Sequence, residues 1–517
     1  MNTATVDTVP VAQLTPQEAW DELYEHRTKY YNRYAAAYSG SRLALNSTGA
    51  AGSFWKRKGK CKMHVPVAAD ISSTSSDLLF SEEPRFTCEH KGTEVNEDKQ
   101  QQRLDDLIAK NNLHSLLNEA AESCSALGDV YLKLNWRANE LDYPTITVVQ
   151  PDNAWPEYLL GIPQCIHFFS FYKQDRNRNI FRLYECYSKG KIEMAIYQGT
   201  KSDLGHKIDD AELKRLGFDS VVKAPVDDLL AVHIANIRPN RSKRHSMLGR
   251  SDYDGLRDLM DALDETYSSW MRDIRLAKAR LIVPAEYLRR RQEDLFKDGQ
   301  YTYEFDEDVE TLVALDIDPE HKTGAQITPS QFQIRAEEHA KTAENLIRQI
   351  ISIAGYSPQT FGLDIEGQAQ SGTALHIREK KSFNTRGKKQ TYWTNPLQAL
   401  MTGLLHLDAT LYPRMGSHSE DVVKVHFSDS MASDLSTISN AVLMLHNAQA
   451  VSTKVKIQML HPDWTNKQVE AEVAAVLQEF AEQMPPPNPA FGDLDSNSYN
   501  PVKTTGDNDE ERVEEDE

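Results

Sequence analysis

The chain carries, at residues 252–281, the stretch DYDGLRDLMDALDETYSSWMRDIRLAKARL. Its apolar side chains recur at steps of three and four residues, which is the spacing of one face of an α-helix. They are Leu256, Leu259, Met260, Leu263, Tyr267, Trp270, Ile274, Ala277 and Leu281. The stretch predicts a helix of about eight turns, and so long a stripe needs a partner along its whole length.

The charges of this stretch are divided between its two halves. The first half is acidic, with only Arg257 of opposite sign: Asp252, Asp254, Asp258, Asp261, Asp264 and Glu265. The second half is basic, with only Asp273 of opposite sign: Arg272, Arg275, Lys278 and Arg280. Acids near the start of a helix and bases near its end suit the helix dipole, so the distribution has a purely structural explanation. A functional role for the second-half bases stays open beside it.

A partner for this helix is predicted farther along the chain. A second amphipathic helix is expected at residues 330–354, ending at Gly355. An insertion of about 45 residues separates the two helices and is bounded by Pro284 and Pro329. Its predicted elements are a short basic helix and two strands, at residues 286–296, 301–305 and 311–315. Two long helices around a small αβ insertion make a hairpin-like arm with a knob at its tip.

The part before this arm predicts an α+β domain. A helix is expected at residues 16–38, where Thr15, Pro16 and Glu18 form a capping-box start, and a loop at 39–62. Another helix is expected at 97–127, closing at Gly128. Short segments rich in β-branched and aromatic residues predict mainly antiparallel strands. They are residues 130–136, 145–149, 165–172, 181–186, 192–197 and 229–237.

The part after the arm begins with the polar loop Asp364–Gly372 and a strongly basic helix. The bases are Arg378, Lys380, Lys381, Arg386, Lys388 and Lys389, against Glu379 alone. Proline removes a hydrogen bond and clashes with the preceding turn, so the helix is expected to kink or restart at Pro396. A strand at 422–427 and helices at 435–448 and 466–484, the last capped by Thr465, follow. Residues 485–517 are expected to be disordered.

Composition excludes several classes of protein. The 517 residues include 58 Lys and Arg against 77 Asp and Glu, a net charge of −19, which disfavours wrapping nucleic acid on a broad basic surface. No secretory signal and no membrane span is expected, so the protein is predicted to be cytosolic and soluble. The longest apolar runs are only about five residues.

Familiar catalytic and metal-binding motifs are missing from the sequence, which offers no catalytic constellation. Asp316, Asp318 and His321 are explained better as a solvated turn than as a metal site. The five cysteines are widely spaced and odd in number, so we expect reduced thiols and neither a disulfide framework nor a zinc site. We therefore expect no metal and no cofactor.

The order of these elements resembles the portal protein, or head-to-tail connector, of tailed bacteriophages, and the branch that infects Gram-positive hosts above all. The resemblance is carried by Ser371–His376, Arg378–Lys381 and Lys388–Trp393, which are similar to the family's loop and kinked helix. Residues 150–156 (QPDNAWP) and 460–465 (LHPDWT) are similar to family segments before the strands and before the last helix. The resemblance covers about residues 15–484.

The resemblance implies an α+β portal fold with named parts. The wing would be residues 1–250 and 356–430, with a tunnel loop at 364–372 and a kinked helix at 373–411. The stem helices would be 251–281 and 329–355, the clip 282–328 and the crown 431–484, before the acidic tail at 485–517.

The resemblance also implies a function. Such proteins form a ring, usually of twelve subunits, at one capsid vertex, and the terminase motor drives double-stranded DNA through it during packaging. The tunnel loop would face DNA with Asp364, Glu366, Gln368 and Gln370. The bases of the kinked helix would face DNA or a neighbouring subunit, and stem bases would be Arg272, Arg275 and Lys278. Further implied partners are capsid, scaffolding and head-completion proteins, and the implied location is the virion, with assembly in the host cytoplasm.

Two other functions remain open at this point. A non-viral scaffold could use the same amphipathic helices to build a ring or bundle without DNA. A nuclease with an unrecognised acidic metal site is a weaker alternative.

The net charge fits a DNA conduit, because each phosphate neutralised by Lys or Arg adds affinity and slows sliding. Residues Asp507–Glu517, with eight acids and one arginine, contribute −7 of the −19, which leaves −12 for the rest.

Overall fold

The computed structural model describes most of the chain. The described residues are 13–39, 56–57, 60–61, 63–89, 97–137, 140–176, 178–277, 280–282, 290–292, 301–303, 328–330, 333–363, 372–413, 422–427, 435–461 and 466–483. None of the helices among them is long and apolar enough to cross a membrane. The chain divides into two compact units, residues 1–428 and 429–517, which are described separately.

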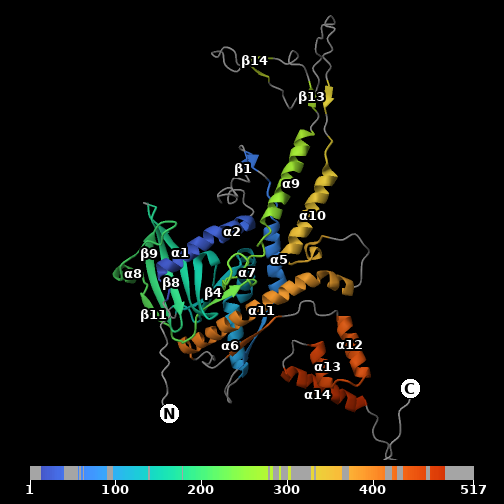
Figure 1. Cartoon of the computed structure of the whole chain (residues 1–517). Coiled ribbons are helices and arrows are strands. Elements are labelled where there is room, and N and C mark those ends of the chain that lie inside the picture. The colour runs from blue at the N-terminus through green and yellow to red at the C-terminus, as the bar shows by residue number, and fades with distance from the viewer. Residues whose placement is uncertain are drawn as a thin grey trace, which may run out of the picture. The chain divides into compact units, whose positions relative to one another are not determined.

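The first unit begins with one helical run, shown in blue in Figure 1. It consists of α1 (Pro16–His26), a π-helical turn η1 (Arg27–Tyr31) and α2 (Asn32–Ser39). The predicted capping box is confirmed, since the Thr15 side chain accepts from the Glu18 N–H and Glu18 binds the Thr15 backbone in return. Of the expected loop after it, only the strands β1 (Lys56–Arg57) and β2 (Lys60–Cys61) and residues from 63 on are described.

The single helix expected at 97–127 is wrong, because two helices occupy this range. α6 (Glu97–Lys110) ends before Asn112, which adopts the left-handed conformation with φ 48°, and α7 (Leu113–Leu127) begins after it. Asparagine tolerates this conformation better than most residues, so the chain breaks there. The predicted end at Gly128 is confirmed. A further helix that the sequence did not predict, α5 (Val67–Phe80), packs on α7.

The strands pair antiparallel throughout the described residues, as predicted. The largest sheet has the order β10-β9-β8-β7-β6, with β11 also on β9; a second has the order β12-β4-β5, and β17 pairs with β3. The bounds are β3 Arg85–Glu89, β4 Asp129–Asn135, β5 Thr145–Val149, β6 Ala154–Leu159, β7 Ile162–Gln174, β8 Ile180–Ser188, β9 Lys191–Gly199, β10 His206–Lys207, β11 Val221–Lys223, β12 Ala231–Ala235 and β17 Val422–His426. Short helices connect them: η2 Pro151–Asn153 and α8 Asp210–Arg215.

The two long arm helices lie side by side and lead away from the sheets (Figure 1). They are α9 (Arg257–Leu276) and α10 (Ala336–Ala354), and both are shorter than predicted. Residues 252–256 form turns instead of the first helical turn, because Asp252 and Tyr253 are buried in the body of the fold. The predicted stop at Gly355 is confirmed, and a short turn of helix, η4 (Pro358–Phe361), follows it.

Between the arm helices the structure describes only four short strands. β13 (Arg280–Ile282) pairs with β16 (Thr328–Ser330), and β14 (Arg290–Gln292) pairs with β15 (Tyr301–Tyr303). The helix expected at 286–296 is therefore wrong, because β14 occupies the middle of that range. The strand expected from Tyr301 is present. The strand expected at 311–315 and the Asp316, Asp318 and His321 turn lie outside the described residues.

The last helix of the first unit is α11, which runs without interruption from Gly372 to Leu411. Of the kink or restart expected at Pro396, the restart does not occur, because the helix continues through the proline into a deeply buried segment. Buried apolar side chains hold this segment in place: Trp393, Leu397, Leu400, Met401, Leu404, Leu405 and Leu407. A buried ion pair between Arg103 of α6 and Asp408, 2.7 Å apart, fixes its end.

The second unit is helical in its described residues. It contains α12 (Leu435–Asn447), α13 (Thr453–Leu460) and α14 (Asn466–Gln483), and α13 contacts both of the others. The sequence predicted α12 and α14 but missed α13. The signal for α13 is its N-cap serine, since the Ser452 side chain accepts a hydrogen bond from the Val455 N–H. Thr465, the expected cap of α14, lies outside the described residues.

Candidate functional site

Charged and aromatic contacts join the last turns of α9 to the start of α10. Asp273 on α9 accepts hydrogen bonds from Arg335, just before α10, at 2.9 Å, and from His339 on α10 at 3.0 Å. The hydrogen bonds from His339 and Arg335 lower the pKa of Asp273. Trp270 stacks on the His339 ring, with centroids 6.2 Å apart. These contacts fix the register of the helix pair.

Part of the apolar surface of the arm stays exposed. Ile274 on α9 is 41% exposed, although the sequence placed it in the buried stripe, and Ile353 on α10 is 58% exposed. Ile334, beside the start of α10, is 43% exposed. The predicted stem bases Arg272 and Arg275 are exposed as well, and Lys278 lies outside the described residues. The arm therefore offers a mixed apolar and basic surface.

The basic part of α11 docks onto the end of α10. The Lys381 ammonium donates to the Ser352 carbonyl and, at 2.9 Å, to the Ser352 hydroxyl. A lysine at this place suits the negative end of the helix dipole. Close by, the Ser382 hydroxyl accepts from the Ser357 N–H at 2.8 Å, and the Thr385 hydroxyl donates to the Gly355 carbonyl at 2.6 Å. The arm and α11 are thereby linked through three side chains within one turn of α11.

A buried carboxylate, Asp252, lies where the arm leaves the body of the fold. It accepts hydrogen bonds from Lys389 at 2.6 Å, Ser125 at 2.7 Å and Tyr356 at 2.8 Å. The Asn236 amide donates to its other oxygen at 2.8 Å. The four donors come from α11, α7, the turn after α10 and the segment after β12, so one carboxylate joins four separate parts of the fold. We call this network the arm joint.

The structure divides the predicted bases of α11 into two groups. Lys389 is 1% exposed, and its ammonium contacts both Asp252 and Ser75 at 2.6 Å. Arg386 is also buried. Both side chains are thus enclosed by their own subunit, and the role expected for them in facing DNA or a neighbouring subunit stays a prediction.

The other bases of α11 reach the surface where they are described. Lys380, Lys381 and Lys388 are exposed. The side chain of Arg378 and all four expected tunnel-loop residues lie outside the described residues: Asp364, Glu366, Gln368 and Gln370. The available surface charge of this helix is thus smaller than its sequence indicated.

Two clusters escaped the sequence reasoning. The arm joint was missed because Asp252 was one of six acids in the first half of its stretch, and nothing local distinguished it. Cys165, His167 and Cys186 also gather in a buried cluster. Its local signal was the alternation of Cys165 and His167, which places both on one face of a strand, but the partner Cys186 depends on strand register.

One family of known proteins matches nearly the whole chain. The model of the family described as "Phage portal protein, SPP1 Gp6-like" matches residues 12–485. One similar structure is titled "Virion of native gene transfer agent (GTA) particle", at 10% identity and TM-score 0.38, covering 86% of this chain and 94% of that one. Another is titled "Neck of empty GTA particle computed with C6 symmetry", at 12% identity and TM-score 0.39, covering 77% and 90%. Among curated proteins, none matches this chain by sequence.

Proposed function

Because the chain belongs to the SPP1 Gp6-like family of phage portal proteins, we propose that it forms a closed ring at one capsid vertex through which double-stranded DNA passes during packaging and ejection. The observation that carries the proposal is the extent of the family match, residues 12–485, which spans every helix and strand described above. A structural protein of the virion, and not an enzyme, is the role that this membership supports.

Ring geometry is consistent with a DNA conduit. Twelve helices packed about 9–10 Å apart trace a circle of roughly 110–120 Å. That circumference corresponds to a diameter of about 35–38 Å, and subtracting a helix half-width of about 5 Å on each side leaves a hole of roughly 25–28 Å. B-form DNA is about 20 Å wide and would pass with its grooves unread. We assign the lining of this hole to the arm helices α9 and α10.

Neighbouring subunits would cover the exposed apolar side chains of the arm. Ile274 and Ile353 are large, exposed and carried by helices that pack on each other only along one side. Burying a side chain of this size stabilises an interface by about 1.5–3 kcal/mol. Arg272 and Arg275 lie on α9 beside Ile274, so they would lie at the subunit interface or the channel wall.

The surface charge suits a conduit that does not hold its cargo. Each phosphate neutralised by a protein cation releases counterions and adds affinity, which opposes sliding. A chain of net charge −19 limits this grip. We assign the exposed Lys380 and Lys388 to DNA or to a neighbouring subunit, and Lys381 to the contact between α11 and the arm. We assign the loop Asp364–Gly372 to the DNA-facing constriction.

The finer parts of the proposal follow the family resemblance. We assign the wing, stem, clip and crown to the residue ranges given above, and a Gram-positive bacterium as host. The proposed partners are the terminase motor, the major capsid and scaffolding proteins, and a head-completion protein. The ring would assemble in the host cytoplasm and remain at the vertex of the virion.

Electron microscopy of the purified full-length chain tests the ring. Negatively stained particles should be rings with a central hole, and native mass spectrometry should give one closed subunit number near twelve. A monomer or an open filament would contradict the proposal. A non-viral scaffold without DNA would also form rings, so the second test is packaging.

Packaging by assembled heads separates a portal from a scaffold. The double reversal Lys380→Glu with Lys381→Glu should lower ring yield or DNA content per particle. Deletion of residues 366–370 should leave rings intact and lower DNA content. Wild-type DNA content in both variants would refute the assignment of these segments.

A further inference from the structure

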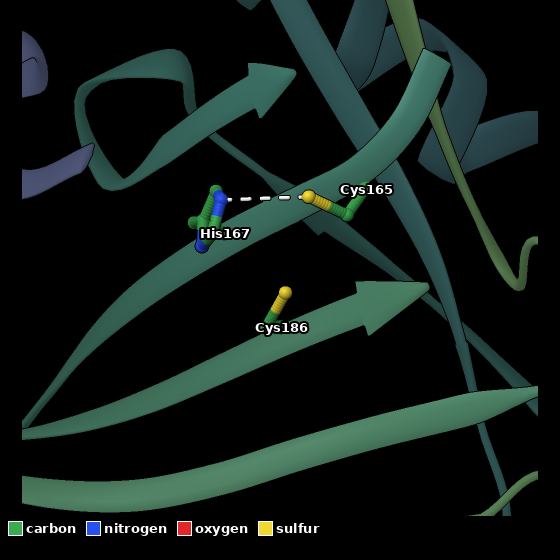
Figure 2. Close-up of side chains that lie close together, drawn as sticks. All are labelled: Cys165, His167 and Cys186. Atoms are coloured by element: carbon green, nitrogen blue, oxygen red, sulfur yellow. Dashed lines mark hydrogen bonds between the residues drawn. The ribbon is translucent and has the colours of Figure 1, made fainter. Parts of the chain in front are cut away.

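Four side chains with metal-binding atoms share one face of the large sheet. Glu157 on β6 pairs directly with Cys165 on β7, and His167 on β7 pairs directly with Cys186 on β8. Directly paired residues lie on the same face of a sheet, and so do residues two apart on one strand. Figure 2 shows Cys165 and His167 on one strand and Cys186 on the next, with their side chains gathered together.

The distances within this cluster are close to those of a tetrahedral zinc site. The metal-binding atoms of Cys165, His167 and Cys186 all lie within 4.8 Å of one another. The Cys165 Sγ to His167 Nε2 distance is 3.5 Å. Zinc bonds of about 2.3 Å to sulfur and 2.0–2.1 Å to nitrogen place such a pair about 3.5 Å apart in a tetrahedron. Two cysteine sulfurs would lie about 3.8 Å apart, so little movement is required.

Glu157 is the candidate for the fourth ligand, through a carboxylate oxygen. Tyr184 is the hydrogen-bond partner of His167 on the side away from the metal. Glu157 Oε1 lies 2.6 Å from His167 Nε2 but is not part of the group whose atoms all lie within 4.8 Å of one another, so the Glu157 side chain would have to turn toward the two sulfurs to complete the site. The other ring nitrogen, Nδ1, lies 2.8 Å from the Tyr184 hydroxyl. With Nδ1–H held by Tyr184, loss of the Nε2 proton on metal binding would free the Nε2 lone pair for the ion. Metal-binding histidines in proteins are oriented by such a contact.

The cluster is closed to solvent, as structural zinc sites are. Cys165 is 0%, His167 1% and Cys186 3% exposed. The N-terminal segment covers it, because the Leu14 N–H donates to Glu157 Oε1 at 2.9 Å and Trp20 of α1 packs edge-on against Phe169 of β7. A metal ion here would tie the start of the chain to the sheet.

We propose that Cys165, His167, Cys186 and Glu157 form a structural Zn²⁺ site in the wing of this protein. The type of ligand selects zinc, since two thiolates, an imidazole and a carboxylate make a closed tetrahedral set. On binding, two S–H bonds and the Nε2–H bond break, four bonds to zinc form, and up to three protons leave to solvent. The site is independent of ring formation.

Metal analysis of the full-length chain tests the site. Protein purified without chelator and incubated with Zn²⁺ should retain about one zinc per chain after desalting, measured by inductively coupled plasma mass spectrometry. Cys186→Ser should lower the zinc content at least tenfold. Cys88→Ser, at a partly buried cysteine on the separate β3–β17 sheet, is the matched control and should retain zinc.

Cobalt substitution tests the proposed metal site in the wild-type protein alone. The wild-type chain with Co²⁺ in place of Zn²⁺ should show thiolate charge-transfer absorption and the intense visible bands of tetrahedral cobalt. Proton release on binding should accompany them. Wild-type protein that holds less than a tenth of a zinc per chain and shows no cobalt bands overturns the proposal. So does a disulfide between Cys165 and Cys186, seen as two thiols protected from alkylation until reduction.

Discussion

The contacts of Lys389 in the arm joint predict that its replacement strongly destabilises the fold. In Lys389→Met the ammonium is lost while a side chain of similar length remains. The Asp252 carboxylate then stays buried with three neutral donors and no counter-charge. Breaking a buried ion pair from one side costs about 3–5 kcal/mol, because the remaining charge is desolvated and uncompensated.

The expected change in melting temperature follows from this free-energy loss and from the size of the folding unit. The first unit ends at residue 428. At about 2.1 cal/mol/K per residue, its unfolding entropy is about 0.9 kcal/mol/K, so we expect the melting temperature to fall by roughly 3–6 °C. Differential scanning calorimetry or fluorimetry of the full-length protein measures the shift. The neighbouring Lys388→Met is the matched control, since Lys388 is exposed and its loss should cost less than about 0.5 kcal/mol.

A double-mutant cycle isolates the charge pair from the rest of the network. In Lys389→Met with Asp252→Asn, both charges are removed and the amide can still accept from Tyr356 or Ser125. The double variant should therefore be more stable than Lys389→Met alone, by about 1–3 kcal/mol. If Lys389→Met melts like Lys388→Met, or if the second substitution adds its full cost to the first, the arm joint does not depend on this pair.

Three further predictions concern other parts of the fold. Gly128→Ala should destabilise the protein by about 2–4 kcal/mol in urea unfolding, because φ is 99° and an added Cβ would lie 2.8 Å from the Ser251 nitrogen; a smaller loss than about 1 kcal/mol would contradict this geometry. Burial lowers the pKa of His26 to about 4, so the unfolded chain binds a proton below about pH 6.5 that the folded chain does not. Stability should fall by about 3 kcal/mol between about pH 6.5 and pH 4, and His26→Phe should remove that part of the acid sensitivity; parallel pH profiles for both proteins would refute it. Asp273→Asn should speed amide hydrogen exchange in the first turns of α10 while α11 is unchanged, since the carboxylate that accepts hydrogen bonds from Arg335 and His339 is lost.

Local signals predicted the elements that depend on local interactions. Alternating β-branched residues predicted Thr145–Val149 with both ends correct, and glycine stops at 128 and 355 were confirmed because those residues adopt left-handed conformations. α5 was missed because its buried face is lined partly by serines, Ser72, Ser75 and Ser76, which carry no apolar periodicity. A buried hydroxyl is recognisable only once its hydrogen-bond partner is known.

Long-range pairing decided what local patterns left undetermined. The helix was predicted to begin at Asp252, yet α9 begins at Arg257, because Asp252 is drawn into the arm joint by donors more than 100 residues away on either side. Pro396 breaks one backbone hydrogen bond, but the buried side chains of the following segment hold α11 together through it. In both places tertiary contacts outweigh a local preference.

The buried bases change the argument from charge to function. In the sequence, the segment from Arg378 to Lys389 was the strongest local exception to an acidic chain. In the fold, Lys389 is neutralised by Asp252, and the Lys381 ammonium is engaged by Ser352 at the end of α10. Under the proposed function, much of this segment's charge then fixes α11 to the arm instead of attracting phosphate. Weakening the Lys389 pair should therefore lower the DNA content per particle even in rings that assemble normally.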